Sequence, residues 1–309
     1  MSRPRVDGAA SVPSIAPAPR DSGFRMEGWH VWCGSVIRGE DGLYHLFASR
    51  WPEATGFPGG YFQHSEIVRA VCENPLGPYH FAEVVIGKRS PGKWDSAMAH
   101  NPAIYRAGGG YVLYYIGLDE GSSFRRIGLA TAPTLRGPWV RRDEPLHLGL
   151  HDDANNPSAC FAADGSLRLI WRNAALKVRL SSAPSFEGPY RLENEDVWPG
   201  AKLEDFYFFK KDGAWRVLCE DNVGAVSGHE RWGVLLGSAD GVGGWEALPR
   251  PVVYDHTIHW AEGGTFEATR RERPWLLVEQ GAATHLFTGV WDGKRAWNQP
   301  VPLEARWPL

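Results

Sequence analysis

Features that would assign this sequence to a membrane or secreted class are missing. The 309 residues contain no apolar run near the roughly 20 residues that a helix needs to span a bilayer. Residues 1–20 lack the apolar segment of a secretory signal. The cysteines form no Cys-x-x-Cys pair and have no metal-ligand spacing, which is typical of reduced thiols. We therefore expect a cytoplasmic protein with four reduced cysteines: Cys33, Cys72, Cys160 and Cys219.

An excess of one charge is also missing, since 33 basic and 36 acidic residues give a net charge of −3. Without a basic block or an acidic tail, the chain is not expected to bind nucleic acid or a membrane. The sequence has no glycine-rich nucleotide loop, no Gly-x-Ser-x-Gly nucleophile and no His-Glu-x-x-His zinc motif. No helical periodicity is sustained over ten residues, which argues against an α-helical fold.

Turn residues are abundant, with 36 glycines and 23 prolines, and there are 15 tryptophans. A strand, a Gly/Pro turn and a second strand that begins with an aromatic residue recur along the chain. The four turns are Gly77-Pro78-Tyr79, Gly137-Pro138-Trp139, Gly188-Pro189-Tyr190 and the looser Gly243-Gly244-Trp245. Their first glycines are 60, 51 and 55 residues apart. Such spacing indicates a supersecondary unit that repeats.

A β-hairpin precedes each of these turns. The hairpin sequences are GSVIRGEDGLYHLFASR, PAIYRAGGGYVLYYIGL, SACFAADGSLRLIWRN and YFFKKDGAWRVLCEDN, and a weaker fifth copy is FEATRRERPWLLVEQG followed by THLFTGVWDG. Two hairpins in each unit of about 40–60 residues are typical of propeller blades. The sequence predicts an all-β, five-bladed β-propeller over residues 25–309, after a flexible or extended arm over residues 1–24. A series of β-sandwich domains is the alternative, although no linker separates the units.

Acids and histidines gather in the segments that lead into the first strand of each predicted blade. These segments are EGWHVWC, WDSAMAHN, HDDANN, KLED and HWAEGGTFE. The first strand of a propeller blade lines the central axis, so we expect these side chains to converge on an axial pocket. Two alternatives stay open. Asp and Asn side chains often only cap turns, and the same oxygens could hold a structural cation on the axis.

The repeated phrases resemble those of the five-bladed glycoside hydrolases of families 43, 62, 32, 68, 117 and 130. The resemblance covers roughly residues 25–300 and lies in phrases such as IGLATAPTLRGPW and HNPAIYR followed by GGYVLYYIG. It implies a propeller that hydrolyses the glycosidic bond of an oligosaccharide or glycoside without a cofactor. One departure from family 43 is clear. There, an Asp begins the first inner strand as general base, and here Cys33 stands at that place.

Glycosidic cleavage needs two carboxyl groups, one to protonate the leaving oxygen and one to activate water or attack carbon. We assign Glu204 as the general acid and Asp95 as the base or nucleophile, with Asp205 as a third catalytic candidate. The candidate sugar ligands, which offer hydroxyl-binding groups or stacking rings, are Trp32, His100, Asn101, Asp153, Asn156, Asp221, His259, Trp260 and Glu267. The two tryptophans could equally fill the core.

Two other functions stay open on the sequence alone. A phosphorylase of the family 130 type would replace one carboxylate with a phosphate site, for which Arg270, Arg271 and Arg273 are available. A non-catalytic sugar-binding propeller is supported by Cys33 at the place of the usual Asp. Glycoside cleavage measured with and without phosphate separates the three functions.

Overall fold

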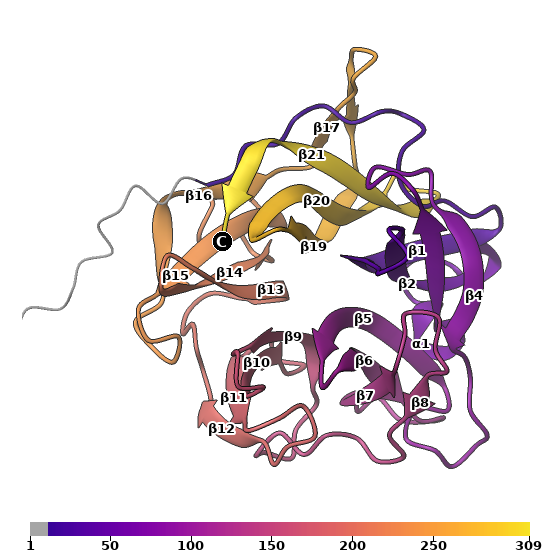
Figure 1. The fold of residues 1–309 in the computed structure, drawn as a ribbon, viewed down its shortest axis with the longest axis vertical. Coiled ribbons are helices and arrows are strands. Elements are labelled where there is room, and N and C mark those ends of the chain that lie inside the picture. The colour runs from indigo at the N-terminus through magenta and orange to yellow at the C-terminus, as the bar shows by residue number, and fades with distance from the viewer. Residues whose placement is uncertain (1–11) are drawn as a thin grey trace, which may run out of the picture.

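Five antiparallel sheets surround one axis in the computed structural model, which describes residues 12–309 (Figure 1). Blade 1 consists of β1 (Trp29–Arg38), β2 (Tyr44–Pro52), β3 (Glu66–Cys72) and β4 (His80–Ile86). Blade 2 consists of β5 (Met98–Ala107), β6 (Gly110–Leu118), β7 (Arg126–Ala132) and β8 (Val140–Arg141). Blade 3 consists of β9 (Asn155–Phe161), β10 (Leu167–Arg172), β11 (Val178–Ala183) and β12 (Arg191–Asn194).

The last two blades and a separate hairpin complete the ring. Blade 4 consists of β13 (Leu203–Lys211), β14 (Ala214–Asp221), β15 (Trp232–Ser238) and β16 (Glu246–Tyr254). The hairpin is β17 (Thr257–His259) with β18 (Thr265–Glu267), and blade 5 consists of β19 (Arg270–Glu279), β20 (Ala282–Trp291) and β21 (Ala296–Pro308). The helical segments are a 3-10 turn, η1 (Glu53–Thr55), and α1 (Tyr61–His64). The predicted all-β, five-bladed propeller is confirmed.

The inner strands contact one another in sequence around the ring: β1 with β5, β5 with β9, β9 with β13, β13 with β19, and β19 with β1. The four predicted Gly/Pro turns each connect the third strand of a blade to its fourth strand. The predicted hairpins supply the first and second strands. Because one short turn serves the same connection in four blades, its recurrence in the sequence reports the blade repeat directly.

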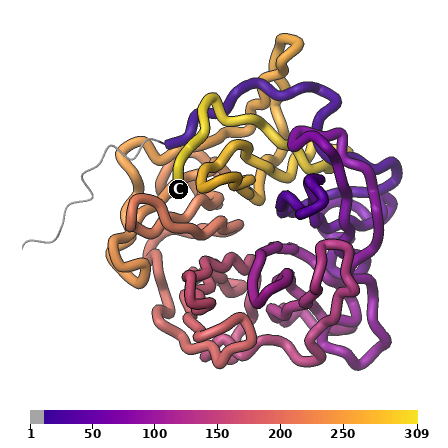
Figure 2. Tube along the Cα trace, viewed as in Figure 1, coloured from indigo at the N-terminus to yellow at the C-terminus, as the bar shows by residue number. Residues whose placement is uncertain are grey.

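The N-terminal segment lies along blade 5, which has three strands of its own. Ile15 pairs with Leu303 and Phe24 pairs with Asn298, so residues 15–24 run beside β21 (Figure 2). Residues 15–24 thereby lie against the last strand of the chain at the edge of blade 5. The first part of the predicted arm, residues 1–11, lies outside the described residues.

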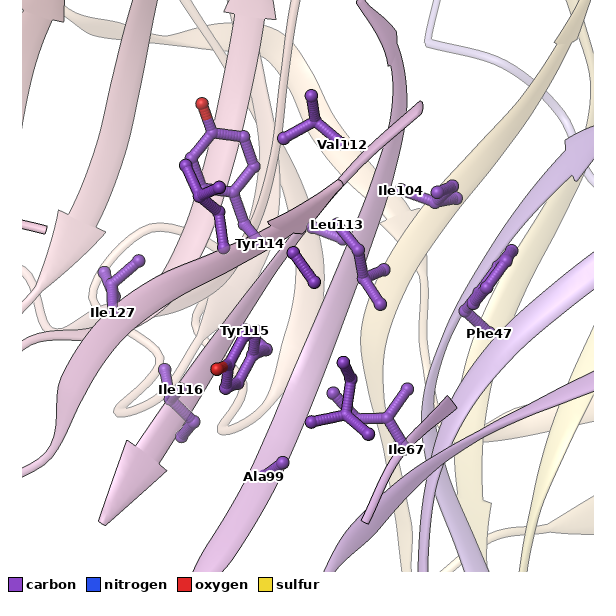
Figure 3. Close-up of a cluster of buried hydrophobic side chains, with 14 of the residues drawn as sticks. Phe47, Ile67, Ala99, Ile104, Val112, Leu113, Tyr114, Tyr115, Ile116 and Ile127 are labelled. Atoms are coloured by element: carbon purple, nitrogen blue, oxygen red, sulfur yellow. The ribbon is translucent and has the colours of Figure 1, made fainter. Parts of the chain in front are cut away.

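The core lies between neighbouring blades, because each blade packs both faces against other sheets. On β6, residues 112–116 are all fully buried, and side chains of both faces belong to one apolar cluster with Phe47 and Ile67 of blade 1 (Figure 3). A strand covered on one face would alternate between buried and exposed residues. The four cysteines are free thiols in this structure. No helix within residues 12–309 is long and apolar enough to cross a membrane.

Each inner strand contains a β-bulge at the same register, where its pairing with the second strand of the blade shifts. One residue of each bulge has a left-handed backbone, with φ between +54° and +61°: Cys33, Asn101, Asn156, Asp205 and Arg273. This conformation is uncommon for residues other than glycine. Because bulges re-aim side chains, the repeat places one residue of every blade at the same height on the axis.

Candidate functional site

A cavity of about 170 Å³ opens on the propeller axis beside the bulges. The residue before the left-handed position lines it in every blade: Trp32, His100, Asn155, Glu204 and Glu272. Four left-handed residues line it as well: Asn101, Asn156, Asp205 and Arg273. The rest of the wall comes from second strands, from α1, from the start of β19 and from loops: Trp51, Phe57, Pro58, Tyr61, Arg172, Arg231 and Arg270.

The left-handed residues form a hydrogen-bonded chain around the axis. The Cys33 thiol donates to Asn101 Oδ1 (2.9 Å), and Asn101 Nδ2 donates to Asn156 Oδ1 (2.9 Å). Asn156 Nδ2 donates to Asp205 Oδ1 (2.5 Å), which also accepts from Arg273. Burial raises the pKa of the Cys33 thiol, so this group stays protonated. The chain fixes the orientation of the side chains on the axis, and it makes Cys33 a donor rather than a thiolate nucleophile.

The wall that comes from blades 1 and 2 is aromatic and neutral. The His100 ring stacks on Tyr61 with ring centroids 4.5 Å apart, and its Nδ1 lies 2.8 Å from Ser65 Oγ. Burial lowers the pKa of His100 well below its usual value, so the imidazole is uncharged. The rings of Trp32 and Phe57 meet edge to face, with centroids 4.9 Å apart. Ring faces of this kind offer an apolar surface to a sugar.

The wall that comes from blades 3, 4 and 5 is charged. Glu204 Oε2 accepts from Arg172 Nη2 at 2.5 Å, and Glu204 Oε1 accepts from Asn222. Glu272 Oε1 accepts from Arg231 Nη1 at 2.7 Å. The same nitrogen lies 4.0 Å from Glu204 Oε1. One guanidinium group therefore lies between two carboxyl groups that come from neighbouring inner strands.

Glu220 lies behind this wall, fully buried on β14 and opposite Glu204 in the strand pairing. Its Oε1 accepts from Arg231 Nη1 at 3.0 Å, while its Oε2 has no partner within residues 12–309. Burial, and next Glu272, raise the pKa of Glu220 well above its usual value. Burial, and next Asp205, raise the pKa of Glu272 to about 7. Two carboxyl groups of this cluster therefore keep a proton at pH values where an exposed Glu is ionised.

Asp205, Glu220 and Glu272 are the group of side chains within residues 12–309 that could hold a metal ion, since one oxygen of each lies within 4.8 Å of the others. Carboxylate oxygens are the ligands that Ca²⁺ prefers. However, Arg231 donates to Glu220 and Glu272, and Arg273 donates to Asp205. A cation would have to displace both guanidinium groups, so these residues do not fit a resident cation.

Half of the twelve site residues predicted from the sequence line the cavity. Those that the structure brings together are Trp32, His100, Asn101, Asn156, Glu204 and Asp205. The other six lie elsewhere, and each has a structural environment that accounts for it.

Asp95 does not line the cavity, so the expectation that it lies on the axis is wrong. Its side chain is fully buried, where it accepts from Arg89 (3.2 Å), Arg141 (3.3 Å) and the Tyr115 hydroxyl (2.8 Å). Because β5 begins at Met98, Asp95 belongs to the turn before the inner strand. Its carboxylate ties that turn to β6 and β8 of blade 2.

Asp153 and Asp221 also lie outside the cavity and fix loops. Asp153 accepts two hydrogen bonds from the Arg125 guanidinium group, each of 3.0 Å, and one from its backbone N–H. Asp221 accepts from three consecutive backbone N–H groups, those of residues 225–227. Asp221 thus takes the capping role that Asp often has in turns, whereas Asp153 forms an ion pair that holds two loops together.

His259, Trp260 and Glu267 lie on or beside the β17–β18 hairpin, which projects from the rim of the ring (Figure 1). His259 and Glu267 are exposed, and Trp260 is buried with the Arg20 guanidinium group 5.4 Å from its ring centre. This segment does precede the fifth inner strand, but the prediction that its side chains converge on the axial pocket is wrong. The strand that lines the axis is β19, and the hairpin is an additional element before it.

In blade 5, the left-handed residue is Arg273 and the residue before it is Glu272. A signal for this pair was present in the sequence. Proline follows the left-handed residue in three blades, as Asn101-Pro102, Asn156-Pro157 and Arg273-Pro274. Among the arginines proposed for phosphate, Arg270 and Arg273 line the cavity. Arg271 does not, and it donates to the Thr257 carbonyl at 2.9 Å.

The sequence reasoning missed the residues that reach the cavity from second strands and loops. Asn155, on the inner strand β9 directly before Asn156, was missed as well. The residues from second strands, loops and α1 that line the cavity are Trp51, Phe57, Pro58, Tyr61, Arg172 and Arg231, and Glu220 lies behind them. Their approach depends on strand pairing and on loop paths, for which no local motif exists.

Replacing Asp95 with asparagine is expected to destabilise the protein without abolishing turnover. The change removes the charge that two arginines share, and hydrogen bonds to charged groups contribute about 1.5–3 kcal/mol each. Because the arginines are partly exposed and can be solvated, we expect a loss of about 1–2 kcal/mol in the free energy of unfolding. Urea denaturation measures this loss. Normal stability combined with lost glycoside turnover would restore a catalytic role for Asp95.

The comparisons with known proteins agree with the fold. No protein-family model matches the chain, and no curated protein matches it. A family 43 β-xylosidase/α-arabinofuranosidase from a compost metagenome, solved with xylotriose, superimposes with a TM-score of 0.68 at 15% identity over 95% of this chain and 98% of its own. A family 62 α-L-arabinofuranosidase from Coprinopsis cinerea gives a TM-score of 0.69 at 13% identity, over 96% and 98% of the two chains.

A third solved structure extends this similarity to another family. A family 117 glycoside hydrolase from Zobellia galactanivorans gives a TM-score of 0.66 at 16% identity, over 94% of this chain and 89% of its own. At such identities the similarity shows the fold. The resemblance to propeller glycoside hydrolases that the sequence indicated is therefore confirmed at the level of the fold, which this chain shares over nearly its whole length.

Proposed function

We propose that the protein is a glycoside hydrolase in which Glu272 is the general acid and Glu204 is the general base. The observation that carries this proposal is the pair of unlike carboxyl groups on the axis. Glu272 has a pKa of about 7, raised by burial and then by Asp205, so it holds a proton near neutral pH. Glu204 accepts hydrogen bonds from Arg172 and Asn222, one on each carboxyl oxygen, which fix its orientation on the axis. The shared propeller fold of known glycosidases adds support.

The two groups divide the reaction between them. Glu272 gives its proton to the glycosidic oxygen as the bond from that oxygen to the anomeric carbon breaks. Glu204 takes a proton from a water molecule, whose oxygen forms the new bond to the same carbon. Exchange with solvent then returns the proton to Glu272. This assignment reverses the acid role that the sequence suggested for Glu204, because Glu272 is the lining glutamate whose pKa burial raises to about 7.

The remaining lining residues suit a sugar ring. The rings of Trp32, Phe57 and Tyr61 form one wall, and the amides of Asn155 and Asn156 lie on another. Aromatic faces cover the C–H face of a sugar, while amides hydrogen-bond to its hydroxyl groups. Solved propellers with this fold contain xylotriose or cellotriose, which supports an oligosaccharide substrate.

A screen of glycosides tests the proposal. Purified protein is incubated with aryl glycosides of pentoses, hexoses and uronic acids in both anomeric forms, with and without inorganic phosphate. Release of free sugar that is independent of phosphate is the expected result. Formation of a sugar 1-phosphate would identify a phosphorylase instead. Binding of sugars without turnover on any glycoside would favour a non-catalytic propeller.

The rate is expected to fall as the pH rises through about 7. The acid role requires protonated Glu272, whose pKa is about 7, so the active fraction is lost above that value. The loss should be steep for a disaccharide, whose leaving alcohol needs a proton, and shallow for a p-nitrophenyl glycoside, whose leaving group does not. Profiles of kcat/KM against pH for both substrates measure this difference. Equal profiles for the two substrates would contradict the assignment of the acid.

A further inference from the structure

One cavity arginine is almost unpaired within the protein. The side chain of Arg270, at the start of β19, makes no hydrogen bond within residues 12–309, and its nearest acidic atom is Glu272 Oε1 at 3.6 Å. Its guanidinium group lies 5.8 Å from the ring centre of Phe57. The side chain is 29% exposed and lines the cavity. Because a guanidinium group has five N–H donors, Arg270 retains donors that can bind a ligand.

Two neighbouring arginines also retain donors. Arg231 and Arg273 make their side-chain hydrogen bonds through Nη1, to the carboxyl groups already described. Arg172 differs, because its Nη1 donates to the Asn173 carbonyl at 3.1 Å and its Nη2 donates to Glu204. Arg231 and Arg270 are each a little over one quarter exposed, which leaves their free edges open to the cavity.

The charges around the cavity do not cancel. Four arginines line it, against three carboxyl groups, with Glu220 behind them as the fourth. Burial raises the pKa of Glu220 well above its usual value and that of Glu272 to about 7. When these two groups are protonated, the arginines outnumber the ionised carboxylates. An uncompensated buried charge is costly, and an anionic ligand would neutralise it.

We propose that the cavity contains an oxyanion subsite formed by Arg270 and Arg231, which binds either the carboxylate of an acidic sugar or inorganic phosphate. The proposal rests on the proposed glycosidase function and specifies its substrate class. An arginine pairs with a carboxylate or phosphate through two parallel N–H···O bonds, which fix direction as well as charge. The Phe57 ring beside Arg270 would then cover the sugar to which a carboxylate is attached.

Matched glycosides test the preference. Aryl glucosides, galactosides and mannosides are compared with the corresponding uronides, which differ by a carboxylate in place of the CH₂OH group. We expect kcat/KM to be about 10–100-fold higher for one uronide than for its neutral partner, as a charge-assisted hydrogen bond predicts. Equilibrium binding of the free uronic acid and of the free neutral sugar, measured by calorimetry, gives a readout that does not need turnover.

Variants identify the subsite. Arg270→Gln should lower the ratio of uronide to neutral kcat/KM by about tenfold or more, and should weaken uronic acid binding to a similar degree. Arg191→Gln is the matched control, because Arg191 lies on the outer strand β12 with a side chain that is 81% exposed. It removes the same charge from the protein and should leave the ratio as in the wild type.

Each outcome decides between the two sources of the oxyanion or rejects the subsite. Preference for a uronide supports a substrate carboxylate. Cleavage of neutral glycosides that needs phosphate, with phosphate affinity reduced in Arg270→Gln, supports the same subsite with phosphate as its ligand. Cleavage of neutral glycosides without phosphate or uronide preference overturns the subsite and leaves the proposed hydrolase intact. Uronic acid binding without cleavage of any glycoside supports the subsite and rejects the hydrolase.

Discussion

Replacing Glu272 with glutamine is expected to lower kcat on a disaccharide by about 10²–10⁴-fold, because an amide cannot protonate the leaving oxygen. Glutamine can still accept the hydrogen bond from Arg231, so the fold should be retained. Glu204→Gln is expected to cause a loss of similar size, since the amide cannot take a proton from water. Steady-state kinetics on the best substrate of the screen measure both losses.

Substrates with different leaving groups distinguish the acid role of Glu272 from the base role of Glu204. A p-nitrophenyl glycoside needs little protonation, so Glu272→Gln should retain much of its activity on that substrate, whereas Glu204→Gln should lose activity on both. Glu246→Gln, an exposed acid on β16, is the matched control and should behave as the wild type. Near-normal disaccharide turnover by Glu272→Gln would remove Glu272 as the acid. Asp205, whose pKa burial also raises, would then be the next candidate.

The blade architecture could be predicted because short turns with a recognisable local sequence recur in successive blades. The Gly-Pro-aromatic turn always joins the third strand of a blade to the fourth, so its spacing in the sequence is the spacing of the blades. The hairpins before it include strands with continuous apolar runs, such as β6, as strands buried between two sheets do. These signals involve residues that are adjacent in the chain, and they do not depend on how distant strands pair.

The side chains on the axis could be predicted only in part, because their direction depends on the bulge. Asp95 and Asn101 are six positions apart in one segment, yet Asn101 lines the cavity and Asp95 does not. The left-handed backbone at Asn101 turns its side chain inward, and this is a property of strand pairing rather than of composition. Asp95 had the right residue type in the right loop but lies before the strand begins.

The charged wall could not be predicted because it is built by pairing. Glu220 and Glu204 are far enough apart in sequence to belong to different strands, and they meet because β13 and β14 place them directly opposite. Arg231, from the loop after β14, then joins Glu220 to Glu272 of blade 5. Each acid alone resembles an ordinary surface residue. Their shared burial, which raises the pKa of Glu220 and Glu272, appears only after the ring closes.

Replacing Arg273 with methionine is expected to destabilise the fold by about 3–5 kcal/mol, which is the usual cost of leaving a buried charge without its partner. Arg273 donates to Asp205, and both side chains are nearly buried. Burial raises the pKa of Asp205, and Arg273 opposes this effect. Without the arginine the pKa of Asp205 should rise further. Methionine is unbranched, matches the aliphatic part of the arginine side chain in length, and carries no charge.

The stability of Arg273→Met should depend on pH because the pKa of Asp205 is raised in the folded state. A carboxyl group whose pKa is higher in the folded state than in the unfolded state makes the protein less stable as pH rises above the unfolded value, about 3.9 for Asp. The difference in stability between Arg273→Met and the wild type should therefore be largest at neutral pH and should shrink toward pH 4. Urea denaturation at several pH values measures it, with the exposed Arg191→Met as the control.

A second substitution distinguishes the buried charge from lost packing. Adding Asp205→Asn to Arg273→Met removes the unpaired carboxylate while its amide oxygen can still accept from Asn156. The double variant should regain most of the lost stability and should lose the pH dependence, so the two substitutions are strongly non-additive. If the double variant is as unstable as Arg273→Met or less stable, the loss arises from the missing side chain of Arg273. The ion pair at the end of the hydrogen-bonded chain would then contribute little to the closure of the ring.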